Sequence, residues 1–253
     1  MLGNWNVQTL TQQIPFVVAA TGRRRSGKST MMTNLVEQLR SKFDLIISFQ
    51  GSVSCSPHLR QFLIDHFDGR FILEKWDNEL MQRLWQQQND RLKAGLQMRH
   101  VLVLVDDIAM DYRSKEQFAH LCQRGRHCGI SVFICCVSYT VIPKCARRSL
   151  DILFLFDLPM SSCKKILLNE FSKNPSAAEF YLSKLPPYTC LVLSTDKDQQ
   201  LYHLKTSMSQ GHVKSQNKFS LASSSQADCP QSASKNSSSR SGNTHPSHSS
   251  PDP

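Results

Sequence analysis

The chain has 253 residues, of which 40% are hydrophobic, and it carries a formal net charge of +10. This length suffices for one sizeable core, and without a signal peptide or an apolar run of about 18 residues a membrane-bound protein is disfavoured. The positive charge suits a polyanionic partner such as nucleic acid, although it can equally serve solubility. The nine cysteines include no Cys-x2-Cys pair. This pattern disfavours zinc and disulfide frameworks and favours an intracellular protein with reduced thiols.

Apolar, strand-like runs alternate with helical stretches along most of the chain. Helices are expected at 29–39, 59–67, 78–96, 162–171 and 176–185, with a helix end at 118–125. Strands are expected at 16–20, 44–49, 70–73, 100–107, 130–137, 152–157, 189–194 and 200–205. Continuous apolar strands separated by helices predict an α/β fold with a mainly parallel sheet and helices on both faces.

The first motif is a complete phosphate-binding loop, Gly-x4-Gly-Lys-Ser, between the strand at 16–20 and the helix at 29–39. In such a P-loop the backbone N–H groups surround phosphates at the positive end of the helix. Lys28 can reach the β- and γ-phosphates of ATP, and the Ser29 hydroxyl is placed to bind Mg²⁺. The nucleotide-binding residues predicted from this motif are Gly22, Arg23, Arg24, Arg25, Ser26, Gly27, Lys28, Ser29 and Thr30.

Three arginines, Arg23 to Arg25, occupy loop positions that are often small. At least one of them can supplement the neutralisation of phosphate charge. Equally, all three can point outward from a loop whose backbone alone surrounds the phosphates. The sequence leaves both readings open.

The second motif is the apolar run 101–105, which ends in Asp106 and Asp107. A buried strand would bring Asp106 to the carboxyl edge of the sheet, where open α/β sheets bind ligands. There Asp106 can hold the Mg²⁺ that bridges the phosphates, and Asp107 can act as general base toward the attacking water. The competing reading is an ordinary solvated strand end.

Two acids, with a further strand between the two motif strands, indicate an ATPase of the additional-strand class, whose catalytic acid lies on its own strand. A small GTPase is disfavoured because no Asn-Lys-x-Asp motif follows; residues 195–198 read Thr-Asp-Lys-Asp. A nucleoside monophosphate kinase would want an arginine-rich lid and would not need the aspartate pair.

The third motif region carries Arg126-His127, Ser138-Tyr139, Pro143 and Arg147. With the two earlier motifs, it resembles the DNA-packaging ATPases of double-stranded DNA viruses and of Maverick/Polinton-like elements. These ATPases belong to the FtsK/HerA superfamily, and the resemblance to the poxvirus-type packaging ATPase covers about residues 14–195. Two positions depart from the family pattern: Val137 stands where a glutamine is expected, and Ser149 where an asparagine is expected. Valine has no polar group with which to sense a γ-phosphate.

The resemblance implies an ATP- and Mg²⁺-dependent motor that translocates double-stranded DNA, without sequence specificity, into a capsid. It further implies a homo-oligomeric ring, a hexamer in the family, with a capsid- or portal-side viral partner and no membrane. Arg126 and Arg147 are then candidates for the arginine that reaches a neighbouring subunit's γ-phosphate; alternatively, each pairs with a local acid or lies in solvent. The expected location is the host nucleus or a cytoplasmic virus factory, with association with the virion.

The last 48 residues, 206–253, contain 16 serines and few large apolar side chains. Such a stretch cannot bury enough apolar area to offset its ordering entropy. We therefore expect a P-loop ATPase domain at 1–205 and a disordered, Ser-rich tail at 206–253, which can dock a capsid or another packaging factor.

Two other classes of function stay open. One is a small-molecule phosphotransferase of the P-loop class, which would be indifferent to DNA. The other is an assembly scaffold that binds ATP and hydrolyses it weakly, which the valine at position 137 favours.

Overall fold

The computed structural model describes residues 3–51, 57–158, 161–195 and 201–206. Almost the whole tail predicted for 206–253 lies outside the described residues. The division into a domain at 1–205 and a disordered tail therefore stays a prediction. Within the described part, no helix is both long and apolar enough to cross a membrane.

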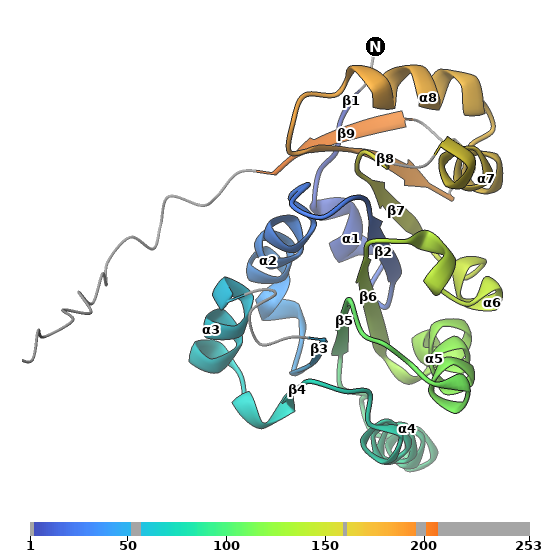
Figure 1. Cartoon of the computed structure of the whole chain (residues 1–253). Coiled ribbons are helices and arrows are strands. Elements are labelled where there is room, and N and C mark those ends of the chain that lie inside the picture. Colours follow the sequence, from blue (N-terminus) through green and yellow to red (C-terminus); the bar gives the residue numbers. More distant parts are fainter. Residues whose placement is uncertain (1–2, 52–56, 159–160, 196–200, 207–253) are drawn as a thin grey trace, which may run out of the picture. The chain divides into compact units, whose positions relative to one another are not determined.

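One mixed sheet forms the centre of the described chain (Figure 1). The described residues contribute nine strands to it. In their order across the sheet they are β1 (Gly3–Asn4), β9 (Leu201–Lys205), β8 (Thr189–Ser194), β7 (Ile152–Leu155), β2 (Val17–Thr21), β6 (Ile130–Cys136), β5 (Val101–Asp106), β3 (Leu45–Gln50) and β4 (Ile72–Leu73).

The run from β7 through β2, β6, β5 and β3 to β4 is parallel, whereas β8 is antiparallel to both β7 and β9. The predicted mainly parallel sheet is confirmed. Strand β6 lies between β2 and β5, as the additional-strand class of ATPase requires. The carboxyl ends of the parallel strands meet at one edge of the sheet, and the start of β8 and the end of β9 lie at that same edge.

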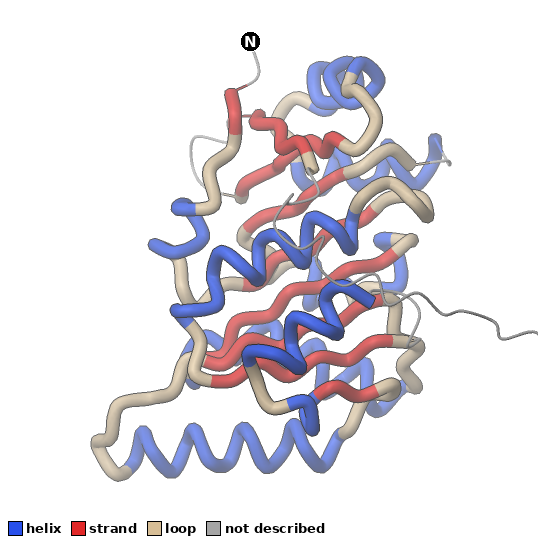
Figure 2. The backbone as a smooth tube through the Cα atoms, turned by 90° about the vertical axis from the view of Figure 1, so that its left-hand side faces the viewer, coloured by secondary structure: helices blue, strands red, loops and turns tan. Residues whose placement is uncertain are grey.

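Helices cover both faces of the sheet. One face carries α1 (Gln8–Gln12), α2 (Lys28–Leu39) and α3 (Pro57–His66). Of these, α2 and α3 lie in front of the strands in Figure 2. The other carries α4 (Asn78–Lys93), α5 (Tyr112–Arg124), α6 (Lys144–Arg147), α7 (Ser161–Phe171) and α8 (Pro175–Lys184). Alternate side chains of β2 enter the two cores, Val18 and Ala20 on the α2 side and Val17 and Ala19 on the other. Burial on both faces explains why the strand sequences are continuously apolar.

The sequence prediction missed β1, α1, α6 and the first half of α5, and two of the predicted elements are shorter than expected. Of the expected strand at 70–73 only β4 forms, because Gly69–Phe71 is a 3₁₀ turn in which the Asp68 carboxylate accepts the Arg70 N–H. The helix expected to reach residue 96 ends at Lys93. Two residues later, Gly95 adopts a left-handed φ of 66°. The Leu96 N–H then bonds the Arg91 carbonyl at 2.9 Å, which closes the helix end.

Candidate active site

The phosphate-binding loop joins β2 to α2 at the carboxyl edge of the sheet, and both of its glycines are sterically required. Gly22 has φ 155°, and a Cβ there would lie 2.5 Å from Phe156 Cβ. Gly27 has φ 102°, and a Cβ there would lie 2.8 Å from Thr206 Oγ1. Because side chains at either position would clash, the close packing of this turn permits only glycine.

Lys28 is buried and holds the loop in shape. Its Nζ donates hydrogen bonds to the carbonyl oxygens of Gly22 and Arg23, both at 2.8 Å. The ammonium group therefore bridges two backbone carbonyls on the inner side of the loop. This position puts its positive charge where phosphates would be surrounded by the loop backbone.

The N-terminus of α2 is open. The helices α4, α5 and α8 are each capped by a side chain, from Asp77, Asp111 and Asn174 respectively. Among the described residues no side chain caps α2, and its first turn contains no acid. Its N–H groups and positive dipole end are thus available to an anion, with Ser29 and Thr30 half-buried in that first turn. The Ser26 hydroxyl oxygen is buried without a hydrogen-bond partner among the described residues. The loop therefore fits a bound polyphosphate.

The three loop arginines are exposed. The Arg23 guanidinium forms an ion pair with Asp157 at 3.0 Å, and the Arg23 N–H bonds the Asp157 carbonyl at 3.0 Å. Arg23 thus ties the loop to the segment after β7. Arg23 therefore points outward from the loop, which is one of the two alternatives that the sequence left open.

The two aspartates of the second motif differ in environment. Asp106 is the last residue of β5 and is buried, whereas Asp107 is exposed with a left-handed φ of 52°. This backbone is held by the Asp107 N–H, which donates to the Cys135 carbonyl at 2.9 Å. Gly51 packs against it so closely that a Cβ on Gly51 would lie 2.4 Å from the Asp107 carbonyl oxygen. A buried acid beside an exposed one fits the predicted division into a metal ligand and a base.

A row of residues crosses the sheet on the α2 face at this edge. The strand register places Ala20 beside Cys135, Cys135 beside Asp106, and Asp106 beside Gln50. These four positions share the face whose core contains α2. Asp106 therefore lies under the phosphate-binding loop and its helix, separated from β2 by one strand. An acid in this place, with Ser29 on the first turn of α2, can hold Mg²⁺.

Gln50 is a member of this row that the sequence analysis missed. Its side chain is buried, its Nε2 donates to Ser48 Oγ at 3.1 Å, and its Oε1 has no hydrogen-bond partner among the described residues. The family glutamine expected at Val137 is absent, yet an amide with a free oxygen lies beside Asp106 on the neighbouring strand. Only strand pairing brings it there, so no local motif could have identified it.

Two cysteines at the end of β6 contribute no charge to the site. Burial raises the pKa of the Cys136 thiol to about 12, and burial also raises the pKa of the Cys135 thiol well above its usual range, with the nearby Asp106 carboxylate as a second cause. Below these pKa values a thiol is neutral, so both are neutral at physiological pH. The charges of the site therefore come from residues other than these two cysteines.

The chain matches one family model, described as Poxvirus A32 protein, over residues 4–175. It belongs to the poxvirus A32 protein family. This confirms the poxvirus-type resemblance inferred from the motifs. No curated protein matches the chain.

Solved structures with the same fold include two viral genome-packaging proteins and a conjugation coupling protein. B204, the DNA-packaging ATPase from Sulfolobus turreted icosahedral virus, has a TM-score of 0.57 at 16% identity, covering 77% of this chain and 98% of B204. B204 from Sulfolobus turreted icosahedral virus 2, in complex with AMPPCP, has a TM-score of 0.51 at 16% identity over 76% and 97%. The pCW3 conjugation coupling protein TcpA with ATPγS has a TM-score of 0.58 at 14% identity over 76% and 60%. These likenesses confirm the P-loop ATPase fold.

In this A32-family chain Arg126 lies at the amino edge of the sheet, opposite the phosphate-binding loop. Its guanidinium pairs with Asp151, the residue before β7, at 3.2 Å. The same carboxylate accepts the N–H of Val17, the first residue of β2, at 2.7 Å. Arg126 therefore cannot serve the nucleotide of its own subunit. Its role toward a neighbouring subunit stays a prediction, and such a role would require the local ion pair to open.

Arg147 is also engaged locally. Its Nε lies 3.5 Å from Glu170 Oε2, and its guanidinium carbon lies 4.9 Å from the centre of the Tyr139 ring, which itself packs edge-on against Phe171. Its side chain is only 16% exposed. Burial, and secondarily the Glu170 carboxylate, raises the pKa of the Tyr139 phenol. Arg147 thus joins α6 to α7, which matches the local pairing that the sequence left open.

We expect Arg147→Ala to destabilise the fold by about 2 kcal/mol, because it leaves the partly buried Glu170 unpaired and removes the ring contact. The melting temperature should fall by about 4–8 °C, measured by differential scanning calorimetry. The control is the adjacent, exposed Arg148, whose replacement by alanine should change the stability by less than about 0.5 kcal/mol. An unchanged melting temperature, with ATP hydrolysis lost, would instead assign Arg147 to catalysis.

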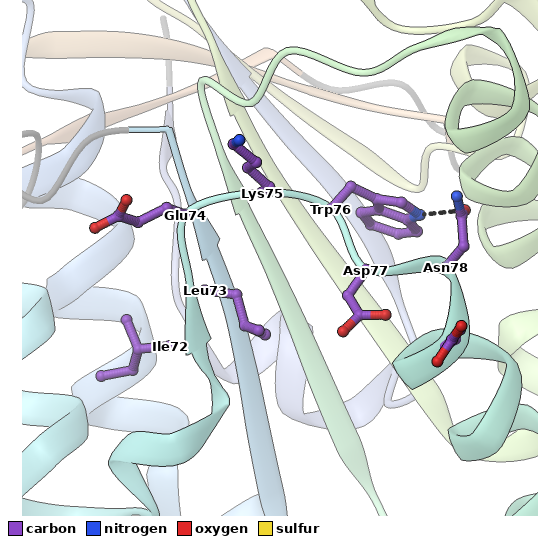
Figure 3. A pocket seen from close by; sticks show the side chains of 8 residues that line it. Ile72, Leu73, Glu74, Lys75, Trp76, Asp77 and Asn78 are labelled. Carbon is purple, nitrogen blue, oxygen red and sulfur yellow. Dashed lines mark hydrogen bonds between the residues drawn. The ribbon is translucent and has the colours of Figure 1, made fainter.

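A groove at the outer strand β4 lies apart from these residues (Figure 3). The Trp76 indole N–H at its wall donates to Asn78 Oδ1 at 3.1 Å and to Gln117 Oε1 at 2.9 Å. Strands β6, β5 and β3 separate β4 from β2. The groove is therefore not part of the phosphate-binding site. It is lined by Ile72, Leu73, Glu74, Lys75, Trp76, Asp77, Asn78 and Glu79.

Proposed function

We propose that this chain is an ATP-driven motor that translocates double-stranded viral DNA into a capsid. One observation carries most of the proposal: the buried Asp106 lies one strand away from the phosphate-binding loop, on the face of the sheet that carries α2. Membership of the A32 family and the fold shared with the DNA-packaging ATPase B204 support the same function.

The chemistry follows from the positions of the chain's own residues. Lys28 and the open N-terminus of α2 hold the polyphosphate of ATP. Asp107, exposed beside the buried Asp106, accepts a proton from the water that attacks the γ-phosphorus, and the products are ADP and phosphate. Ser29 and Asp106 would hold Mg²⁺, which neutralises charge on the β- and γ-phosphates. Gln50, with its free Oε1 beside Asp106, is available to orient a water molecule there.

The net charge of +10 supports DNA as the partner on which the motor acts. Binding would be mainly to phosphates and so independent of sequence. We further propose a homo-oligomeric ring and a capsid- or portal-side viral partner, because a motor that fills a capsid must bind both the DNA and the container. The corresponding location is the site of viral genome packaging in the host nucleus or a cytoplasmic virus factory.

The test is the steady-state ATP hydrolysis rate of the full chain with and without long double-stranded DNA. We expect stimulation by DNA. If the chain makes six to ten phosphate contacts, its affinity for DNA should fall about 10³- to 10⁵-fold between 50 and 200 mM salt. Hydrolysis that DNA leaves unchanged, together with phosphate transfer to a small acceptor, would favour the phosphotransferase. Assembly on ATP with negligible turnover would favour the scaffold.

A further inference from the structure

The carboxyl edge of the sheet continues beyond the phosphate-binding loop on the side away from Asp106. There β7 ends, β8 begins after Tyr188, and β9 ends before Thr206. The acids of the site lie on the other side of β2, reached through β6. The loop is thus flanked by charged, reactive residues on one side and by the ends of β7, β8 and β9 on the other.

Tyr188 stands out among the side chains on this second side. It is 58% exposed, although it is a large aromatic residue, and its backbone has a left-handed φ of 60°. Both the N–H and the hydroxyl of Thr206 donate to the Tyr188 carbonyl, at 2.8 and 2.7 Å, and fix this conformation. Non-glycine residues persist in this region only where the surroundings hold them, often at ligand-binding sites.

The Tyr188 ring directly borders the phosphate-binding loop. Its Cδ1 lies 3.4 Å from the position that a Cβ on Gly27 would take, and the buried Phe156 ring lies 3.6 Å from the same point. An exposed ring is therefore held beside the residue that precedes α2. Nothing in the chemistry of phosphate binding or hydrolysis requires an aromatic group there.

If Asp106 and Asp107 act at the γ-phosphate, as in the proposed function, the base at the opposite end of the nucleotide would extend toward β7, β8 and β9. We propose that Tyr188 is the stacking platform for the base of the bound nucleotide, an inference that rests on the nucleotide binding in the proposed function. A planar base can cover the exposed ring, which is favourable because both surfaces are apolar and polarisable. Since every base has a π-face, such stacking discriminates weakly between ATP and GTP.

The experiment compares the affinities of the full chain for ATP, GTP and inorganic tripolyphosphate by titration calorimetry, without DNA. Tyr188→Asn removes the ring and keeps the backbone, because asparagine tolerates a left-handed φ better than other side chains. We expect its affinity for ATP and GTP to fall about 5- to 100-fold, with an unchanged affinity for tripolyphosphate. Tyr188→Phe should bind ATP like the wild type. Phe180→Ala removes another exposed aromatic, on α8, and should have no effect.

A second measurement does not depend on the stability of the asparagine variant. In Tyr188→Trp, ATP should change the tryptophan fluorescence beyond the wild-type response, whereas tripolyphosphate should not. Three results would each contradict the proposed role of Tyr188. One is an equal loss of affinity for ATP and tripolyphosphate in Tyr188→Asn, and another is an unchanged ATP affinity in that variant. The third is a fluorescence response of Tyr188→Trp that does not differ from the wild type. A chain that binds ATP through Tyr188, but whose ATP hydrolysis DNA does not stimulate, would contradict the proposed motor and support the role of Tyr188. The two proposals can therefore fail independently.

Discussion

Replacing Lys28 by alanine should abolish ATP hydrolysis, with a fall in rate of at least about 10²- to 10³-fold. The Lys28 ammonium bonds the carbonyls of Gly22 and Arg23, so the change removes both the charge that faces the phosphates and the bridge that shapes the loop. ATP affinity should fall as well, because the ground state also loses this charge. The rate is measured by phosphate release and the affinity by titration calorimetry.

The control for this change is Lys164, another little-exposed lysine, which pairs with Glu179 at 3.7 Å on the helices α7 and α8. Lys164→Ala should leave the hydrolysis rate within about twofold of the wild type, since electrostatic effects on the transition state are local. Retention of more than a tenth of the wild-type rate in Lys28→Ala would contradict the assignment of the loop as the catalytic phosphate site.

Asp106→Asn should lower the hydrolysis rate by about 10²- to 10³-fold and leave ATP binding measurable in the absence of Mg²⁺. The substitution keeps the size of a buried side chain and removes its charge, which the proposed magnesium site would need. ATP binding without Mg²⁺ should therefore distinguish the two variants, because Lys28→Ala removes a positive charge that binds the phosphates directly. The measurement is phosphate release over a range of Mg²⁺ concentrations.

Asp44 offers the matched control, because its carboxylate accepts the His100 N–H at 2.8 Å, just before β3 and β5 begin at the opposite edge. Asp44→Asn should hydrolyse ATP at the wild-type rate even if it is slightly less stable. A normal rate in Asp106→Asn at every Mg²⁺ concentration would remove Asp106 from the reaction.

The course of the sheet could be predicted to a large extent, because its inner strands are buried on both faces and therefore read as uninterrupted apolar runs. The ends β1 and β4 are the weak points: Gly3–Asn4 has no apolar pattern, and the strand expected at 70–73 is shortened by the turn that Asp68 caps. Short edge elements depend on their neighbours for stability, so their own residues carry little signal.

The sequence by itself determined the chemistry that contiguous residues perform. A phosphate-binding loop needs two glycines, a lysine and a serine at fixed spacing between strand and helix, and an acid at a strand end needs only its own strand to reach the sheet edge. Only the tertiary structure decided which distant residues meet. The placing of Gln50 beside Asp106 follows from strand order and register, and so does that of Tyr188 beside Gly27. The local pairing of Arg126 and Arg147 depends on which way each side chain points once its element is packed. Residues far apart along the chain leave no joint pattern in it, because their contacts exist only after the strands have paired.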